Sequence, residues 1–162
     1  MIALGLTVAL PTPKRPVVRA VLLRDPFDAD EIPPVADVTL AEEFELTSPE
    51  EDWARLASDY FQAVSGRVST LKPDIVIVRR ADMPRRPNNL DGPRLRLVVE
   101  GAISAAAYRH VANSHLRTGL ACATAYGQHK DIMDAAGRAL VQRTNRAEAA
   151  GAALSGLIAN RT

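Results

Sequence analysis

The side chains best suited to chemistry are arginines that gather around the end of one apolar segment. Six of them lie between positions 79 and 96: Arg79, Arg80, Arg85, Arg86, Arg94 and Arg96. Lys14 and Arg15, in an earlier turn, extend the same set. Guanidinium groups bind phosphate oxygens through paired hydrogen bonds, which predicts a polyanion-binding surface. A solvated loop in a chain with 17 Arg and 3 Lys is the alternative interpretation.

Other reactive side chains form no pattern that we can assign to catalysis. His110, His115 and His129 have no metal-ligand spacing with Cys122, the single cysteine. The sequence contains neither a G-x-S-x-G elbow nor a phosphate-binding G-x-x-x-x-G-K-[ST] loop. Cys122 has no partner for an internal disulfide, so we expect a small buried core residue. No cofactor is predicted from these residues.

Charge is divided unevenly along the chain. Residues 25–52 hold 11 acids and no Lys or Arg, whereas the remainder carries 20 basic residues and 8 acids. The basic remainder favours a polyanionic partner, and the acidic segment could instead dock a basic protein or mimic nucleic acid. No apolar run reaches the roughly 18 residues of a membrane span, so a cytoplasmic protein is expected.

Apolar periodicity predicts the elements that position these residues within a single domain, 1–162. Strands are expected at 2–10, 17–24, 35–46 and 74–78, and a short strand within 111–120. A helix starting at the cap Ser48 is expected to continue through 71, with Trp53 on its apolar face. Further helices are predicted at 95–110, 126–141 and 147–158, with 81–94 as a loop. This β-β-β-α-β-α-β-α-α order predicts an α/β fold with three antiparallel strands, then alternation, in a mixed sheet with helices on both faces.

Five segments, taken in order, resemble the RuvC-type Holliday-junction resolvases of the RNase H-like superfamily. The opening IALGLTVAL is similar to the family's I-L-G-I-D-P-G strand, and PDIVIVRR is similar to its P-D-x-V-x-V-E-E strand. EGAISAAAYRH is similar to the R-G-A-x-x-A-A helix, with Glu100 in place of the arginine. YGQHKDIMDAAGRAL and NRAEAAGAALSGL resemble the last two helices, which end in D-x-A-D-A-x-A. The resemblance spans nearly the whole chain and implies an RNase H-like fold.

The resemblance also implies where a metal site would lie. Active members hold one or two Mg²⁺ ions with four carboxylates, because phosphodiester hydrolysis uses a metal-bound water. Those four positions correspond here to Thr7, Arg79, Asn145 and Glu148. Glu148 alone keeps a carboxylate, and arginine cannot bind a metal. We therefore expect a degenerate site with no metal, in which Arg79 either contacts a ligand or pairs with Glu148.

Three functions remain open on this basis. The first is a degenerate RuvC-like domain, or pseudo-nuclease, that binds nucleic acid such as branched DNA without cutting it. The second is a structural or partner-binding subunit that uses the acidic segment 25–52. The third is a nuclease with displaced carboxylates, which would need Mg²⁺. The resemblance further implies a homodimer, because resolvases of this type act as two-fold dimers.

Overall fold

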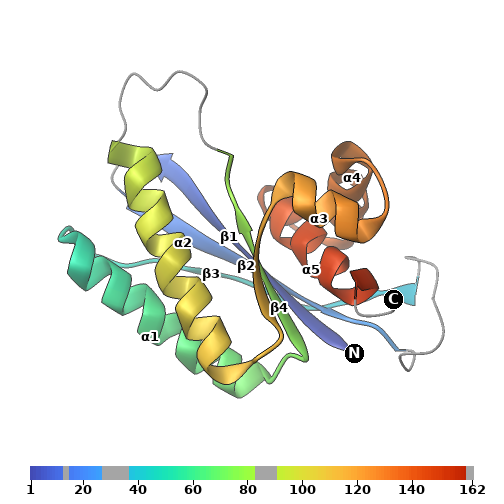
Figure 1. The fold of residues 1–162 in the computed structure, drawn as a ribbon, viewed down its shortest axis with the longest axis horizontal. Coiled ribbons are helices and arrows are strands. Elements are labelled where there is room, and N and C mark those ends of the chain that lie inside the picture. Colours follow the sequence, from blue (N-terminus) through green and yellow to red (C-terminus); the bar gives the residue numbers. More distant parts are fainter. Residues whose placement is uncertain (13–14, 27–36, 83–90, 160–162) are drawn as a thin grey trace.

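A computed structural model describes residues 1–12, 15–26, 37–82 and 91–159, which form a mixed five-stranded sheet covered by helices on both faces (Figure 1). The strand order is β3-β2-β1-β4-β5. β1 and β2 pair antiparallel, as do β2 and β3, whereas β4 and β5 run parallel to their neighbours. The strands are β1 (Ile2–Thr12), β2 (Arg15–Arg24), β3 (Thr39–Leu46), β4 (Ile75–Arg80) and β5 (Ser114–Thr118). This confirms the predicted sheet and its three antiparallel leading strands.

The helices divide between the two faces of the sheet. On one face, α1 and α2 pack together, and on the other lie α3, α4 and α5 (Figure 1). Their bounds are α1 (Trp53–Leu71), α2 (Asp91–His110), α3 (Gly119–Tyr126), α4 (Lys130–Leu140) and α5 (Ala147–Ala159), with a short 3₁₀ turn, η2 (Thr144–Arg146), before α5. In the part of the chain described here, no helix has the length and apolar character needed to cross a membrane.

Two apolar cores follow from the alternation of side chains along the central strands. Leu4, Leu6 and Val8 of β1 face α1 and α2, whereas Ala3 faces the C-terminal helices. Both sets are buried, which explains why β1 reads as a continuous apolar run rather than an alternating one.

Small residues bring α5 into close contact with the sheet and with α4. A Cβ at Gly5 would lie 1.9 Å from the backbone oxygen of Ala149, and one at Gly137 would lie 2.6 Å from that of Ala147. The small-residue face predicted for the last helix is therefore the face that packs. This contact fixes the start of α5 above the ends of β1 and β4.

Several predicted boundaries are wrong, each for a local reason. The first helix starts after Asp52, whose Oδ1 accepts from the amides of Ala54 and Arg55, whereas Ser48 donates to Asp59 instead. The second helix begins at Asp91, four residues early. The helix predicted at 126–141 is α4 but begins only at Lys130, because Gly127 adopts φ 77° and ends a preceding helix, α3, that was not predicted.

Candidate functional site

A row of polar side chains crosses the sheet on the face that carries α3, α4 and α5. Thr7 of β1 pairs in register with Arg19 of β2 and with Arg79 of β4. The row continues to Glu45 on β3 and to Arg117 on β5. Thr7 and Arg79 lie toward the carboxyl ends of parallel strands, which is the edge where α/β sheets bind ligands.

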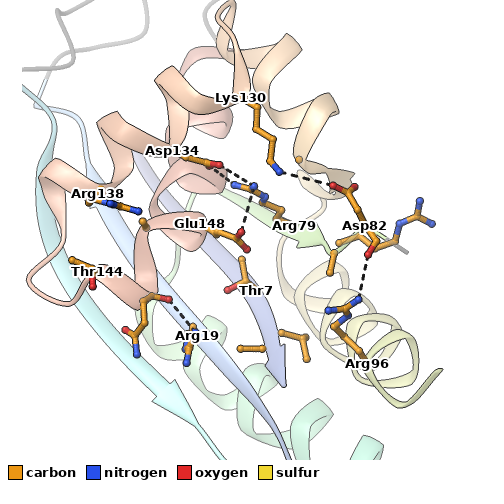
Figure 2. Close-up of a pocket in the computed structure, with 17 residues that line it drawn as sticks. Thr7, Arg19, Arg79, Asp82, Arg96, Lys130, Asp134, Arg138, Thr144 and Glu148 are labelled. Atoms are coloured by element: carbon orange, nitrogen blue, oxygen red, sulfur yellow. Dashed lines mark hydrogen bonds and ion pairs between the residues drawn. The ribbon is translucent and has the colours of Figure 1, made fainter. Parts of the chain in front are cut away.

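A cleft of about 480 Å³ opens above this row, between the sheet, the start of α2 and the start of α4 (Figure 2). Six cationic and three acidic side chains contribute to its described lining, so its charge balance is positive. The cations are Arg19, Arg79, Arg80, Arg96, Lys130 and Arg138, and the acids are Asp82, Asp134 and Glu148. Such an excess favours an anionic ligand.

Arg79 is the buried centre of this charge arrangement, with 4% of its side chain exposed. Its Nη1 donates to Asp134 Oδ1 at 2.5 Å and its Nη2 donates to Asp134 Oδ2 at 3.2 Å. Glu148 Oε1 lies 3.7 Å from Nη2. Burial by itself lowers the pKa of Arg79, but the Asp134 hydrogen bond and the charges of Glu148 and Asp134 outweigh burial and raise the pKa. The guanidinium is therefore held charged by two carboxylates.

Asp134 is the principal partner that sequence reasoning missed. The expected pair between Arg79 and Glu148 exists, but the bidentate contact belongs to Asp134. Lys130, Asp134 and Arg138 follow one another at four-residue spacing on α4, and all three line the cleft (Figure 2). Charges at that spacing lie on one face of a helix, so the sequence alone could have indicated that this face of α4 is charged.

The four positions that the resemblance assigned to metal ligands do meet in space. Thr7, Arg79, Asn145 and Glu148 all line the cleft. Thr7 is buried, and Glu148 lies in the first turn of α5 with 63% of its side chain exposed. Asn145 belongs to η2, and its backbone oxygen accepts a hydrogen bond from Arg19 Nη1 at 3.2 Å.

Only part of the predicted basic set contributes to the cleft. Arg80 and Arg96 line it, whereas Arg15 and Arg94 are exposed and do not. Arg94 is helical because α2 begins earlier than predicted and shortens the expected loop, and Arg96 lies in the same helix, as predicted. Lys14, Arg85 and Arg86 fall outside the described residues. Arg19, Lys130 and Arg138 are cleft cations that sequence reasoning did not single out.

Glu100 is a second buried charge near the end of β4. Its Oε1 accepts from the amide of Ala81 at 2.9 Å, whereas its buried Oε2 has no hydrogen-bond partner among the residues that the structure describes. Burial raises the pKa of this carboxyl, and the Ala81 hydrogen bond with the charges of Arg96 and Arg80 offsets part of that effect. Glu100 thus ties α2 to the strand that carries Arg79.

Four described carboxylates of the acidic segment 25–52 make contacts within the molecule. Glu42 pairs with Arg67 and Glu45 with Arg19, while Glu43 lies 2.9 Å from Nη1 of Arg146. Asp52 caps α1. These contacts connect β3 to α1 and to the turn before α5.

The cleft residues do not fit a divalent metal ion. Mg²⁺ takes oxygen ligands, mostly carboxylates and water. In the described ranges no group of three or more His, Cys, Asp or Glu side chains could hold a metal. A cation placed about 4 Å from the Arg79 guanidinium would also meet a repulsion of about 4 kcal/mol per unit charge at an effective dielectric of 20.

Comparisons with known proteins connect this fold to one known architecture. No protein-family model matches the sequence, and no curated protein is detectably similar to it. The structure of Thermus thermophilus RuvC superposes with a TM-score of 0.69 at 15% identity, covering 96% of this chain and 92% of the other. T. thermophilus RuvC in complex with a Holliday junction substrate gives 0.66, with the same identity and coverage. The expected RuvC-like, RNase H-like fold is thereby confirmed.

Proposed function

We propose that this chain is a RuvC-like domain that binds nucleic acid, branched DNA in particular, in the Arg79 cleft and does not cleave it. The observation that carries the proposal is the buried Arg79, paired with Asp134 at a position where the resemblance expects a metal-binding carboxylate. A fixed guanidinium leaves this edge of the sheet suited to phosphate and unsuited to Mg²⁺.

Binding is supported by the cations on both walls of the cleft. Arg96 of α2 lies on one side and Lys130 and Arg138 of α4 on the other (Figure 2), and Arg80 at the end of β4 also lines the cleft. Arg80 and Arg138 are exposed, so a phosphate backbone can reach them without displacing the core. The solved RuvC complex holds a Holliday junction substrate on the same fold, which makes a four-way junction the first ligand to test.

The absence of cleavage follows from the chemistry of the side chains in the cleft. Activation of water by a metal needs clustered carboxylates. Thr7 and Asn145 offer one neutral oxygen each, and Asp134 is already bonded to Arg79. Of the three acids in the described lining, Glu148 and Asp82 keep largely exposed side chains, and Asp82 Oδ2 lies 3.9 Å from Lys130 Nζ.

A homodimer belongs to the same proposal and is supported by the outer face of α2. Leu97 and Val98 are each 37% exposed and Tyr108 is 65% exposed, with exposed Gly101 and Ala105 between them. A two-fold pair of α2 helices would cover this uncharged stretch, which exposed Arg94 and Arg109 flank. Sedimentation velocity tests this: wild type is expected to be dimeric and Val98→Glu monomeric, and a wild-type monomer at all concentrations would contradict it.

The binding proposal is tested by fluorescence anisotropy on labelled four-way, linear double-stranded and single-stranded DNA, in EDTA. We expect tightest binding to the junction, and the Arg80→Ala, Arg138→Ala double variant should bind about tenfold or more weakly, since two phosphate contacts are lost. Arg55→Ala is the matched control, because Arg55 is exposed on α1 across the sheet. Equal affinity of all three proteins, or no binding at low salt, would reject the proposal.

A further inference from the structure

The cleft is shaped around the Arg79 side chain by two glycines. A Cβ at Gly119 would lie 3.1 Å from Arg79 Nη2 and 3.2 Å from its Nε. A Cβ at Gly151 would lie 3.2 Å from Asp134 Oδ1 and 3.6 Å from Arg79 Nη1. Larger residues at either position would press on the guanidinium or on its carboxylate partner. The two glycines thus leave the space that the Arg79 guanidinium and the Asp134 carboxylate occupy.

Three elements that are distant in sequence converge on this one cation. Arg79 comes from the end of β4, Asp134 from the middle of α4 and Glu148 from the first turn of α5 (Figure 2). The carboxylates approach the guanidinium from two helices, as ligands approach a central ion. Thr7 lies beside them on β1, in register with Arg79.

We propose that the Arg79 guanidinium is a resident cation in place of a divalent metal ion, and that Asp134 and Glu148 form a latent metal site which a carboxylate at position 79 would open. With glutamate there, three carboxylates from β4, α4 and α5 would line the cleft together with Thr7 and Asn145. Hard oxygen donors in that number suit Mn²⁺ or Mg²⁺.

This inference deepens the proposed function and rests on it only for the statement that the native cleft works without metal. It concerns the ions that the protein binds on its own, so no DNA enters its test. A failure here would leave DNA binding untouched, and a failure of DNA binding would leave the latent site untouched.

The test is a Mn²⁺ titration followed by calorimetry and by thermal unfolding, at constant ionic strength. Wild type should show no saturable binding and no change in Tm. Arg79→Glu should bind one or two Mn²⁺ ions and gain Tm as Mn²⁺ is added, because a ligand that binds only the folded state stabilises it. Arg79→Gln is the matched control, since it removes the cation without adding a carboxylate, and it should bind Mn²⁺ at least about tenfold more weakly than Arg79→Glu.

Two further variants make each result decisive. Adding Glu148→Gln to Arg79→Glu should abolish the gain in Mn²⁺ binding. If Arg79→Glu fails to fold even with Mn²⁺, the pair Thr7→Asp, Arg79→Gln supplies the third carboxylate from β1, with the same expected result. Saturable Mn²⁺ binding by wild type that is lost on Asp134→Asn would overturn the inference, as would a folded tri-carboxylate variant that binds no metal.

Discussion

At the residue scale, Arg79 shows how a buried charge is tolerated. Its side chain is 4% exposed, so solvent contributes little to stabilising the guanidinium. The two hydrogen bonds to Asp134 and the nearby Glu148 carboxylate take over that role. Removing one partner of a buried pair is much more costly than the net contribution of the pair, because the other charge is left uncompensated.

Asp134→Asn should therefore destabilise the protein by about 2–3 kcal/mol, a value below that of a fully buried pair because Asp134 keeps 27% of its side chain exposed. The free energy of unfolding from urea titration measures this. Asp131→Asn is the matched control on the same helix, since Asp131 is exposed and should cost at most about 0.5 kcal/mol through the helix dipole. Equal losses in both variants would show that the Arg79 contact contributes nothing specific.

Only some residues of the site could be predicted from sequence. Thr7, Arg79, Asn145 and Glu148 were placed together because the family resemblance assigned them to one site, and all four line the cleft. Asp134 was missed because its contact with Arg79 depends on how α4 packs on the sheet, which the predicted helix 126–141 does not specify. Arg19 was missed because its position in the cleft depends on the register between β1 and β2, which the local sequence pattern does not predict.

At the element scale, the packing of α5 on β1 fixes the floor of the cleft. Gly5 allows the helix backbone to approach the strand, and Ala149 and Ala153 of α5 are the residues that a side chain at position 5 would meet. The face of α5 that carries small residues was predicted from the sequence. The break between α3 and α4 was not predicted, because it depends on Gly127 alone, which adopts a left-handed backbone conformation.

Gly5→Ala should move α5 away from the sheet and cost about 3 kcal/mol or more, or prevent folding, because its Cβ would overlap a backbone oxygen. Gly66→Ala is the opposite case: it lies exposed within α1, with no atom within 4 Å of the added Cβ, and should stabilise by about 0.5–1 kcal/mol. Thermal unfolding of the two variants distinguishes them. A stable Gly5→Ala protein would contradict the close approach of α5 to β1.

Tyr60 joins α1 to the start of β2, since its buried hydroxyl donates to the backbone oxygen of Pro16. Burial raises the pKa of Tyr60 to about 12. In the unfolded chain the phenol ionises near its ordinary value of about 10, so the contribution of Tyr60 is complete below that pH and disappears as pH rises toward 12.

Wild type should therefore lose on the order of 2–3 kcal/mol more stability than Tyr60→Phe between pH 9 and 12, since one pKa unit corresponds to about 1.4 kcal/mol. Urea unfolding at a series of alkaline pH values measures the difference. Phenylalanine keeps the ring and removes the ionisation, so parallel pH profiles for the two proteins would contradict the assignment.

At the scale of the whole molecule, the fold separates a basic cleft from an acidic edge. The acids of β3 are paired with Arg19, Arg67 and Arg146, so the near-neutral net charge of +1 conceals a cleft that is locally positive. Unequal distribution of charge, rather than net charge, is therefore the basis for the proposed nucleic-acid binding. The sequence predicted this uneven distribution of charge. The ion pairs that the β3 carboxylates make within the molecule are seen only in the folded structure.

The salt dependence of DNA affinity should report these cleft cations directly. Each phosphate neutralised by Lys or Arg adds about 0.9 to the slope of log affinity against log salt, so Lys130→Ala with Arg138→Ala should reduce that slope by about 2. Anisotropy titrations at several salt concentrations give the value. An unchanged slope would place the phosphate contacts elsewhere on the molecule.

The measurement that tests the central claim most directly combines binding and cleavage on one sample. A labelled four-way junction is incubated with wild-type protein in Mg²⁺ or Mn²⁺, then resolved on a native gel and on a denaturing gel. We expect a shifted complex on the native gel and intact strands on the denaturing gel, with or without metal. Metal-dependent cleavage products that disappear with Glu148→Gln would contradict the account, because the Arg79 cleft would then be a working nuclease site.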